Sequence, residues 1–153
     1  MVITFCGHSD FLSTQEEEER LLSLLKKVIQ GKPVDFYLGN YGNFDKFSLN
    51  CAKKYKLLYK NATLIFVTPY LGEWLDSRKD SLQATYDKII YPELENVPPK
   101  FRILKRNEWM INQADHVFFY VNRRRGGAYQ SLLYADKIKK NYINLYQNTF
   151  ELK

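Results

Sequence analysis

The chain has 153 residues, of which 23 are Lys or Arg and 17 are Asp or Glu, so its formal net charge is +6. This length is sufficient for one core without disulfide bonds or metal, and the positive charge favours an anionic partner, either nucleotide or nucleic acid. No apolar run reaches membrane-spanning length and no basic, then apolar leader follows Met1, which argues against membrane insertion and export. The two cysteines, Cys6 and Cys51, form no C-x-x-C pair, so we expect free thiols and a cytoplasmic protein.

Strand and helix signals alternate along the first half of the chain. Residues 2–6 form a short apolar run that ends at Gly7, which is typical of a strand covered on both faces. Thr14 and Glu17 resemble a capping box, and apolar residues then recur at helical spacing until Gly31. A second strand, a second helix and a third strand are predicted over residues 34–38, 44–59 and 63–68.

The second half is harder to interpret at its start. Residues 70–99 contain Pro92, Pro98 and Pro99 and no sustained period, so we expect a long excursion with one short helix. A helix, a strand, a helix and a strand are then predicted over residues 100–113, 116–121, 127–140 and 142–146. This alternation predicts one domain over residues 1–153, an α/β, Rossmann-like three-layer fold. Its central, mostly parallel five-stranded sheet is flanked by helices.

Glycines gather after the predicted strands. Five of the seven glycines fall just after the predicted strands one, two and four: Gly7, Gly39, Gly42, Gly126 and Gly127. In sheets of this kind ligands bind beyond the carboxyl ends of the strands. Glycine there allows close approach to the backbone, and the N-terminus of the next helix offers N–H groups to an anion. Tight turns also use glycine for their own geometry, so a single glycine is weak evidence for a phosphate site. The position of all five glycines at one edge of the sheet is stronger evidence.

Three stretches carry a family resemblance: FCGHSDF, YLGNYGNFDKF and RNEWMINQADHVFFYVNRRRGGAYQSLLYA. Together they resemble the SLOG superfamily, which groups DprA with the "lonely guy" phosphoribohydrolases, and the chain looks like a small stand-alone bacterial member. The resemblance implies a Rossmann-like fold that binds nucleotides or nucleotide-derived ligands. Some members cleave the N-glycosidic bond of nucleoside monophosphates. The matching positions of the phosphoribohydrolase pattern are Arg106, Met110, Asp115, Gly126 and Gly127.

The chain departs from that pattern at the paired glutamates, because Leu132 and Leu133 follow the glycines instead. Cleavage of an N-glycoside needs a carboxylate that stabilises positive charge and activates water. Asp45, Asp10 and Glu108 are candidates for a replacement, and Asp45 and Arg106 are our catalytic candidates if any catalysis is present. Phosphate binding needs only N–H groups and cations, which the glycine turn and the arginines supply.

The predicted ligand site consists of Gly7, His8, Gly39, Tyr41, Gly42, Asp45, Arg106, Arg125, Gly126, Gly127 and Ala128. Tyr41 could stack on a base, whereas Asp45 could equally complement the dipole of its helix, and the arginine run could be a solvated loop. We propose no nucleophile at Cys6, since a cysteine at the end of a buried strand usually serves packing. The spacing of His, Cys and carboxylates predicts no metal site, and no cofactor is expected.

Three function classes follow from these observations. We favour binding or sensing of a nucleotide or nucleotide-derived small molecule. The alternatives are an N-glycoside-cleaving phosphoribohydrolase or ribosyltransferase-type enzyme, and single-stranded DNA binding by analogy with DprA, through lysines and tyrosines. Nucleic acid is the less favoured partner, a homodimer is a reasonable arrangement, and no membrane partner is expected.

Overall fold

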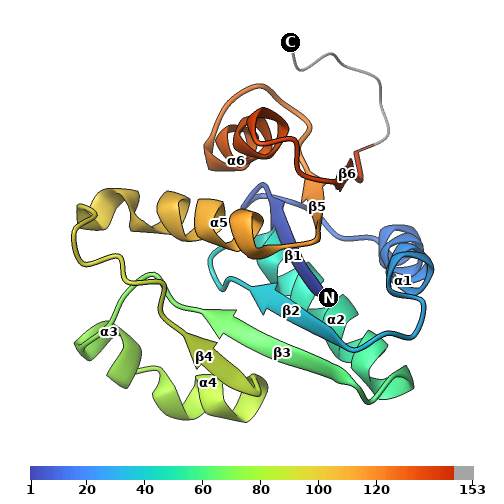
Figure 1. The fold of residues 1–153 in the computed structure, drawn as a ribbon, viewed down its shortest axis with the longest axis horizontal. Helices are drawn as coiled ribbons and strands as arrows, with labels where there is room; N and C mark the ends of the chain where they lie inside the picture. Colours follow the sequence, from blue (N-terminus) through green and yellow to red (C-terminus); the bar gives the residue numbers. More distant parts are fainter. Residues whose placement is uncertain (147–153) are drawn as a thin grey trace.

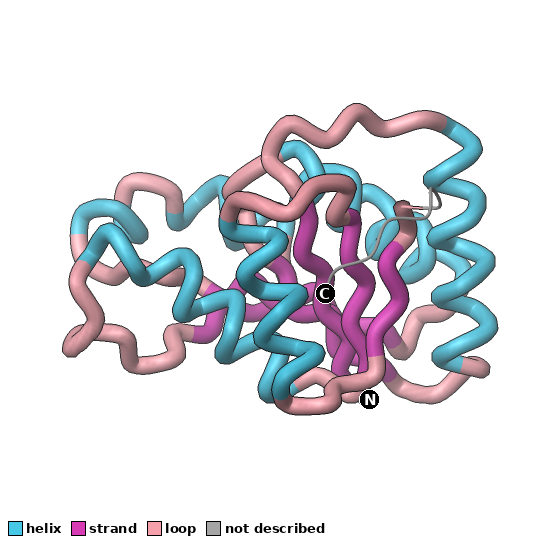
Figure 2. The backbone as a smooth tube through the Cα atoms, turned by 90° about the horizontal axis from the view of Figure 1, so that it is seen from above, coloured by secondary structure: helices cyan, strands magenta, loops and turns pink. Residues whose placement is uncertain are grey.

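The computed structural model describes residues 1–146, and residues 147–153 of the predicted domain lie outside the described residues. Six strands form one sheet in the order β4-β3-β2-β1-β5-β6, and every neighbouring pair is parallel. Helices lie on both sides of this sheet (Figures 1 and 2). The predicted Rossmann-like, three-layer α/β fold is therefore confirmed.

The elements alternate as the sequence predicts, with shifts at their ends. The strands are β1 Val2–Gly7, β2 Val34–Leu38, β3 Ala62–Val67, β4 Lys88–Ile90, β5 His116–Tyr120 and β6 Tyr142–Asn144. The helices are α1 Gln15–Ile29, α2 Asn43–Leu58, α3 Glu73–Asp76, α4 Lys79–Thr85, α5 Arg102–Gln113 and α6 Gly127–Lys137, and the 3₁₀ turn η1 Pro99–Phe101 precedes α5. Thr14 caps α1, because its hydroxyl oxygen accepts a hydrogen bond from the Glu17 N–H at 3.2 Å.

The predicted count of five strands is wrong, because β4 lies within the excursion over residues 70–99. β4 has three residues, pairs only with β3 at the edge of the sheet and is partly exposed, so it lacks the long apolar run of a central strand. The Asp87 carboxylate fixes its start by accepting hydrogen bonds from the Leu64 N–H at 2.8 Å and from Lys56 at 2.6 Å. The excursion also contains two short helices, α3 and α4, where we expected one.

The core lies in two layers, one on each face of the sheet. Side chains of α1 and α2 pack with Ile3, Phe5 and Phe36 on one face. On the other face, Ile111 of α5 and Leu132 of α6 pack with side chains of β1 and β5. Among residues 1–146, no helix is both long enough and apolar enough to cross a membrane.

β1 is the point where the direction of the connections reverses. From β1 the chain proceeds through β2 to β3 and β4 on one side, then returns to β5 and β6 on the other. The turns after β1 and β5 therefore diverge and leave a crevice at their carboxyl ends. The fold thus places a ligand-sized space at the edge where the glycines gather.

Candidate functional site

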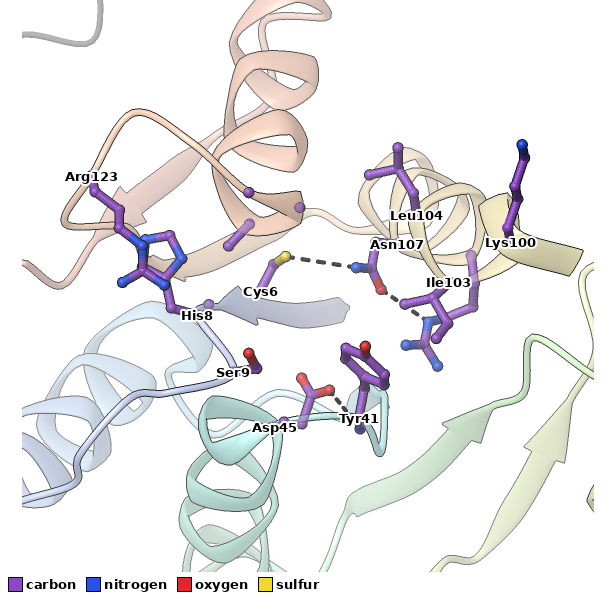
Figure 3. Close-up of a pocket in the computed structure, with 16 residues that line it drawn as sticks. Cys6, His8, Ser9, Tyr41, Asp45, Lys100, Ile103, Leu104, Asn107 and Arg123 are labelled. Atoms are coloured by element: carbon purple, nitrogen blue, oxygen red, sulfur yellow. Dashed lines mark hydrogen bonds between the residues drawn. The ribbon is translucent and has the colours of Figure 1, made fainter.

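A pocket of about 330 Å³ lies at this edge, between the first turns of α2 and α6 and one side of α5 (Figure 3). Most residues of the sequence-predicted site line it: Gly7, His8, Tyr41, Gly42, Asp45, Arg106, Gly126, Gly127 and Ala128. The pocket therefore brings together residues from four separate segments of the chain.

Two residues of the predicted site do not line the pocket. Gly39 is buried, and a Cβ added there would lie 3.0 Å from Arg106 Nη2 and 3.1 Å from Asp45 Oδ2. Arg125 is exposed, and Arg123 takes the place at the pocket wall. The Arg123 guanidinium donates to Asp10 Oδ1 at 3.0 Å and to Asn122 Oδ1 at 3.2 Å, so a neighbouring carboxylate already pairs with it.

A row of residues on α5 and the turn before it was missed by the sequence analysis. Lys100, Ile103, Leu104 and Asn107 line the pocket together. Their spacing of three or four residues places them along one face of a helix. This period was the available signal, but it does not reveal whether that face meets a pocket or a core.

Arg106 is the most deeply buried cation of the site, with 2% of its surface exposed. Its Nε donates to Asn107 Oδ1 and its Nη1 to the Val67 carbonyl oxygen, both at 2.9 Å. No carboxylate in the described part of the chain lies within ion-pairing distance, 4.0 Å, of its nitrogens. Burial lowers the pKa of this guanidinium, which nevertheless stays charged.

Asp45 lies in the first turn of α2 and faces Arg106 without pairing with it directly. Its Oδ2 accepts a hydrogen bond from the Tyr41 N–H at 3.0 Å. Burial raises the pKa of the Asp45 carboxyl, although the nearby Arg106 cation and backbone hydrogen bonds oppose that shift. Part of its function is thus structural, because it holds the turn that carries Tyr41.

The glycines of the edge fall into two groups. A Cβ at Gly7 would lie 2.4 Å from the Phe44 ring, and a Cβ at Gly42 would lie 2.5 Å from Ser9 Cα, so close packing requires both glycines. Gly126 and Gly127 have open space where a Cβ would lie, and only Gly126 adopts positive φ, +90°. Their surface faces the pocket rather than protein atoms.

Gly126 is the N-cap of α6 and makes no side-chain hydrogen bond to the helix. The first N–H groups of a helix have no acceptor inside the helix, and glycine supplies none. The positive end of the helix dipole lies at the same place. Gly127 and Ala128, which both line the pocket, therefore present N–H donors suited to an anion.

His8 and Cys6 have structural partners rather than a catalytic arrangement. His8 Nε2 accepts a hydrogen bond from the Asn122 N–H at 3.2 Å, and burial together with Arg123 lowers the pKa of this imidazole. Burial raises the pKa of the Cys6 thiol to about 12. A thiol with this pKa is a poor nucleophile at neutral pH.

Asp45 is the one carboxylate that lines the pocket among residues 1–146. Asp10 pairs with Arg123 and Glu108 with Lys105, and neither reaches the pocket wall. Leu132 is buried in the core and Leu133 is partly exposed, also away from the pocket. Within the same residues, no group of three His, Cys, Asp or Glu side chains could hold a metal ion.

No protein-family model and no curated protein matches the sequence. A solved structure of DNA processing protein A (DprA) from Helicobacter pylori, described for its single-stranded DNA binding mode, matches with a TM-score of 0.61 and 17% identity. DprA from Streptococcus pneumoniae matches with a TM-score of 0.60 and 10% identity. The chain has a DprA-like fold. The match covers 93% of this chain and 63% of the first DprA, and 92% of this chain and 48% of the second.

The DprA-like fold thus extends over nearly all of this chain, which spans less than two thirds of either DprA chain. At these identities the likeness establishes the fold alone. The fold agrees with the SLOG resemblance of the sequence motifs.

Proposed function

We propose that the pocket binds the phosphate of a nucleotide or nucleotide-derived ligand and that the protein is a binding module or sensor. One observation carries this proposal: the buried Arg106 guanidinium and the uncapped N-terminus of α6 line the same pocket. Both are donors to anions, and they come from segments that are distant in sequence.

The charge of Arg106 supports an anionic ligand. A buried guanidinium is costly unless an opposite charge and hydrogen bonds compensate it. Arg106 has neutral partners at Nε and Nη1, and the Asp45 carboxylate lies more than 4.0 Å from its nitrogens. An anion bound in the pocket would complete the compensation.

The remaining walls suit a nucleoside. Tyr41 stands at the pocket with 68% of its surface exposed, and Ile103 and Leu104 contribute apolar surface from α5 (Figure 3). Exposed aromatic rings can stack on bases. The volume of about 330 Å³ is near the lower end of the range for ligand pockets, roughly 300 to 1,000 Å³, which favours a single nucleotide over a longer chain.

The experiment is calorimetric titration with nucleoside 5′-monophosphates and with the matching nucleosides at fixed salt, after a thermal-shift screen has selected the base. We expect binding of the monophosphate, and weakening by Gly127→Val, whose side chain would enter the space that Gly127 leaves open. Arg106→Ala should cost roughly 1.5 to 3 kcal/mol of binding free energy, the range for a hydrogen bond to a charged group.

The matched control is Lys137→Ala, at the far end of α6. Circular dichroism and thermal unfolding confirm that each variant folds. Equal affinity for nucleoside and monophosphate, or equal losses in Gly127→Val and Lys137→Ala, would contradict the proposal.

Single-stranded DNA binding is the second candidate, because the Helicobacter pylori DprA of the same fold is described for that property. Arg124 and Arg125 are exposed beside the pocket turn and are available to a phosphate backbone. A DNA-binding protein would lose affinity steeply as salt increases. Tight oligonucleotide binding with such a slope, unaffected by Gly127→Val, would favour this function over the first.

A further inference from the structure

The two anion-binding elements of the pocket lie over different strands. Arg106 Nη2 is 3.0 Å from the position that a Cβ would take at Gly39, directly after β2, and Nη1 bonds to Val67 at the end of β3. The N-terminus of α6 follows β5. β1 separates β2 from β5 in the sheet, so at a strand spacing of about 4.8 Å the two elements are about 10 Å apart.

Cys6 and Asn107 line the pocket between these elements. Asn107 Oδ1 accepts from Arg106 Nε at 2.9 Å, and Asn107 Nδ2 reaches Cys6 Sγ at 3.9 Å, above the end of β1 (Figure 3). Arg106 Nε therefore already donates a hydrogen bond within the protein. Nη2, for which no hydrogen bond is recorded among residues 1–146, lies on the side of Gly39 and Asp45.

A single phosphate does not serve both elements at once. Hydrogen bonds about 2.9 Å long on either side of one phosphate fall short of a separation of about 10 Å. Each element nevertheless needs an anion for its own reason. Arg106 is buried without an ion pair in the described residues, and the first turn of α6 has open donors.

We propose, on the basis of the function proposed above, that the natural ligand carries two phosphates: one bound by the N–H groups of Gly127 and Ala128, the other by Nη2 of Arg106. Two ligand chemistries supply a second phosphate, namely a pyrophosphate chain or phosphates on separate hydroxyls of one sugar. The separation of about 10 Å favours the second chemistry, because the sugar then lies over β1, between the two elements.

The test compares adenosine 5′-monophosphate, adenosine 5′-diphosphate and adenosine 3′,5′-bisphosphate by calorimetric titration of the full chain at fixed ionic strength, repeated with the guanosine series. We expect the bisphosphate to bind at least about tenfold more tightly than the monophosphate, a difference of about 1.4 kcal/mol. Arg106→Gln should weaken the bisphosphate more than the monophosphate and so abolish this difference. Gly127→Val should weaken all three ligands.

Two further variants serve as a replacement for Arg106→Gln and as a control. Gly39→Ala places a methyl group 3.0 Å from Nη2 without removing the buried cation, and it replaces Arg106→Gln if that variant does not fold. Lys137→Ala should preserve the tenfold difference, which separates a local effect from the general attraction of a basic protein for charged ligands.

Three outcomes decide between the proposals. A tenfold preference for the diphosphate over the bisphosphate would assign the second phosphate to a pyrophosphate chain. Equal affinities for all three nucleotides, with the monophosphate still bound, would overturn the two-phosphate inference and leave the proposed function standing. Failure of every nucleotide to bind would overturn both.

Discussion

Arg106 Nη2 and Asp45 Oδ2 face each other across Gly39, at 3.0 and 3.1 Å from the position that a Cβ on this glycine would occupy. They form no direct ion pair, since their separation exceeds 4.0 Å. The absence of a side chain at Gly39 therefore keeps a gap between a buried cation and a carboxylate.

Gly39→Ala should disturb both side chains. The added methyl group would lie closer to them than nine in ten real contacts, and overpacking of this kind typically costs about 1 to 3 kcal/mol of unfolding free energy. Urea unfolding measures the loss. Gly127→Ala is the control, because nothing lies within 4 Å of its Cβ position, and it should change stability by about 0.5 kcal/mol or less. Equal stabilities of the two variants would show that Arg106 and Asp45 move aside freely.

Acid should destabilise the protein through its two histidines. Burial lowers the pKa of both His8 and His116 from the ordinary value of 6.5. As the pH falls through 6.5, the unfolded chain binds protons that the folded chain does not, so the free energy of unfolding decreases. The decrease continues until the pH reaches the lowered pKa values of the folded state.

Unfolding of the wild type, His8→Gln and His116→Gln at pH 7.5 and pH 5.5 tests this prediction. Each variant should lose less stability than the wild type between the two pH values, and the double variant least of all. Comparing each variant with the wild type separates the effect of the imidazoles from that of the carboxyls of Asp45 and Glu17. Burial raises the pKa of both carboxyls, so their protonation at lower pH increases the free energy of unfolding instead of decreasing it. Parallel stability curves for all four proteins would show that neither imidazole resists protonation.

The two thiols should be unreactive in the folded protein. Cys6 and Cys51 are free and buried, and burial raises the pKa of each to about 12. The thiolate is the reactive form, so alkylation by iodoacetamide at pH 8 should be many times slower than for an exposed cysteine. Mass spectrometry should find both thiols modified only after unfolding. Rapid labelling of Cys6 alone in native protein would indicate that the pocket opens to solvent at β1.

The purified protein should not hydrolyse nucleoside monophosphates at a measurable rate. Asp45, the one carboxylate that lines the pocket in the described chain, has Oδ2 held by the Tyr41 N–H, and leucines replace the paired glutamates of the phosphoribohydrolase pattern. Chromatographic detection of the free base over several hours provides the measurement. Turnover that Asp45→Asn abolishes would show that Asp45 acts as a replacement catalyst.

The local sequence patterns predicted the main strands, the long helices and the edge where the glycines gather. This succeeds because a strand buried on both faces must be apolar, a helix repeats every 3.6 residues, and parallel strands bring their carboxyl ends to one edge. The edge strand β4 was missed, because three partly exposed residues carry neither pattern.

The roles of individual site residues depended on the tertiary structure. From the sequence, Gly7 and Gly127 look alike, but packing places the Phe44 ring against Gly7 and leaves Gly127 open to the pocket. Likewise Arg123 and Arg125 are adjacent in one charged run, and only the path of the loop places Arg123 at the pocket wall. These distinctions arise from contacts between residues that are far apart in the chain. No local pattern encodes them, whereas the period of a helix or strand is local and can be predicted from the sequence.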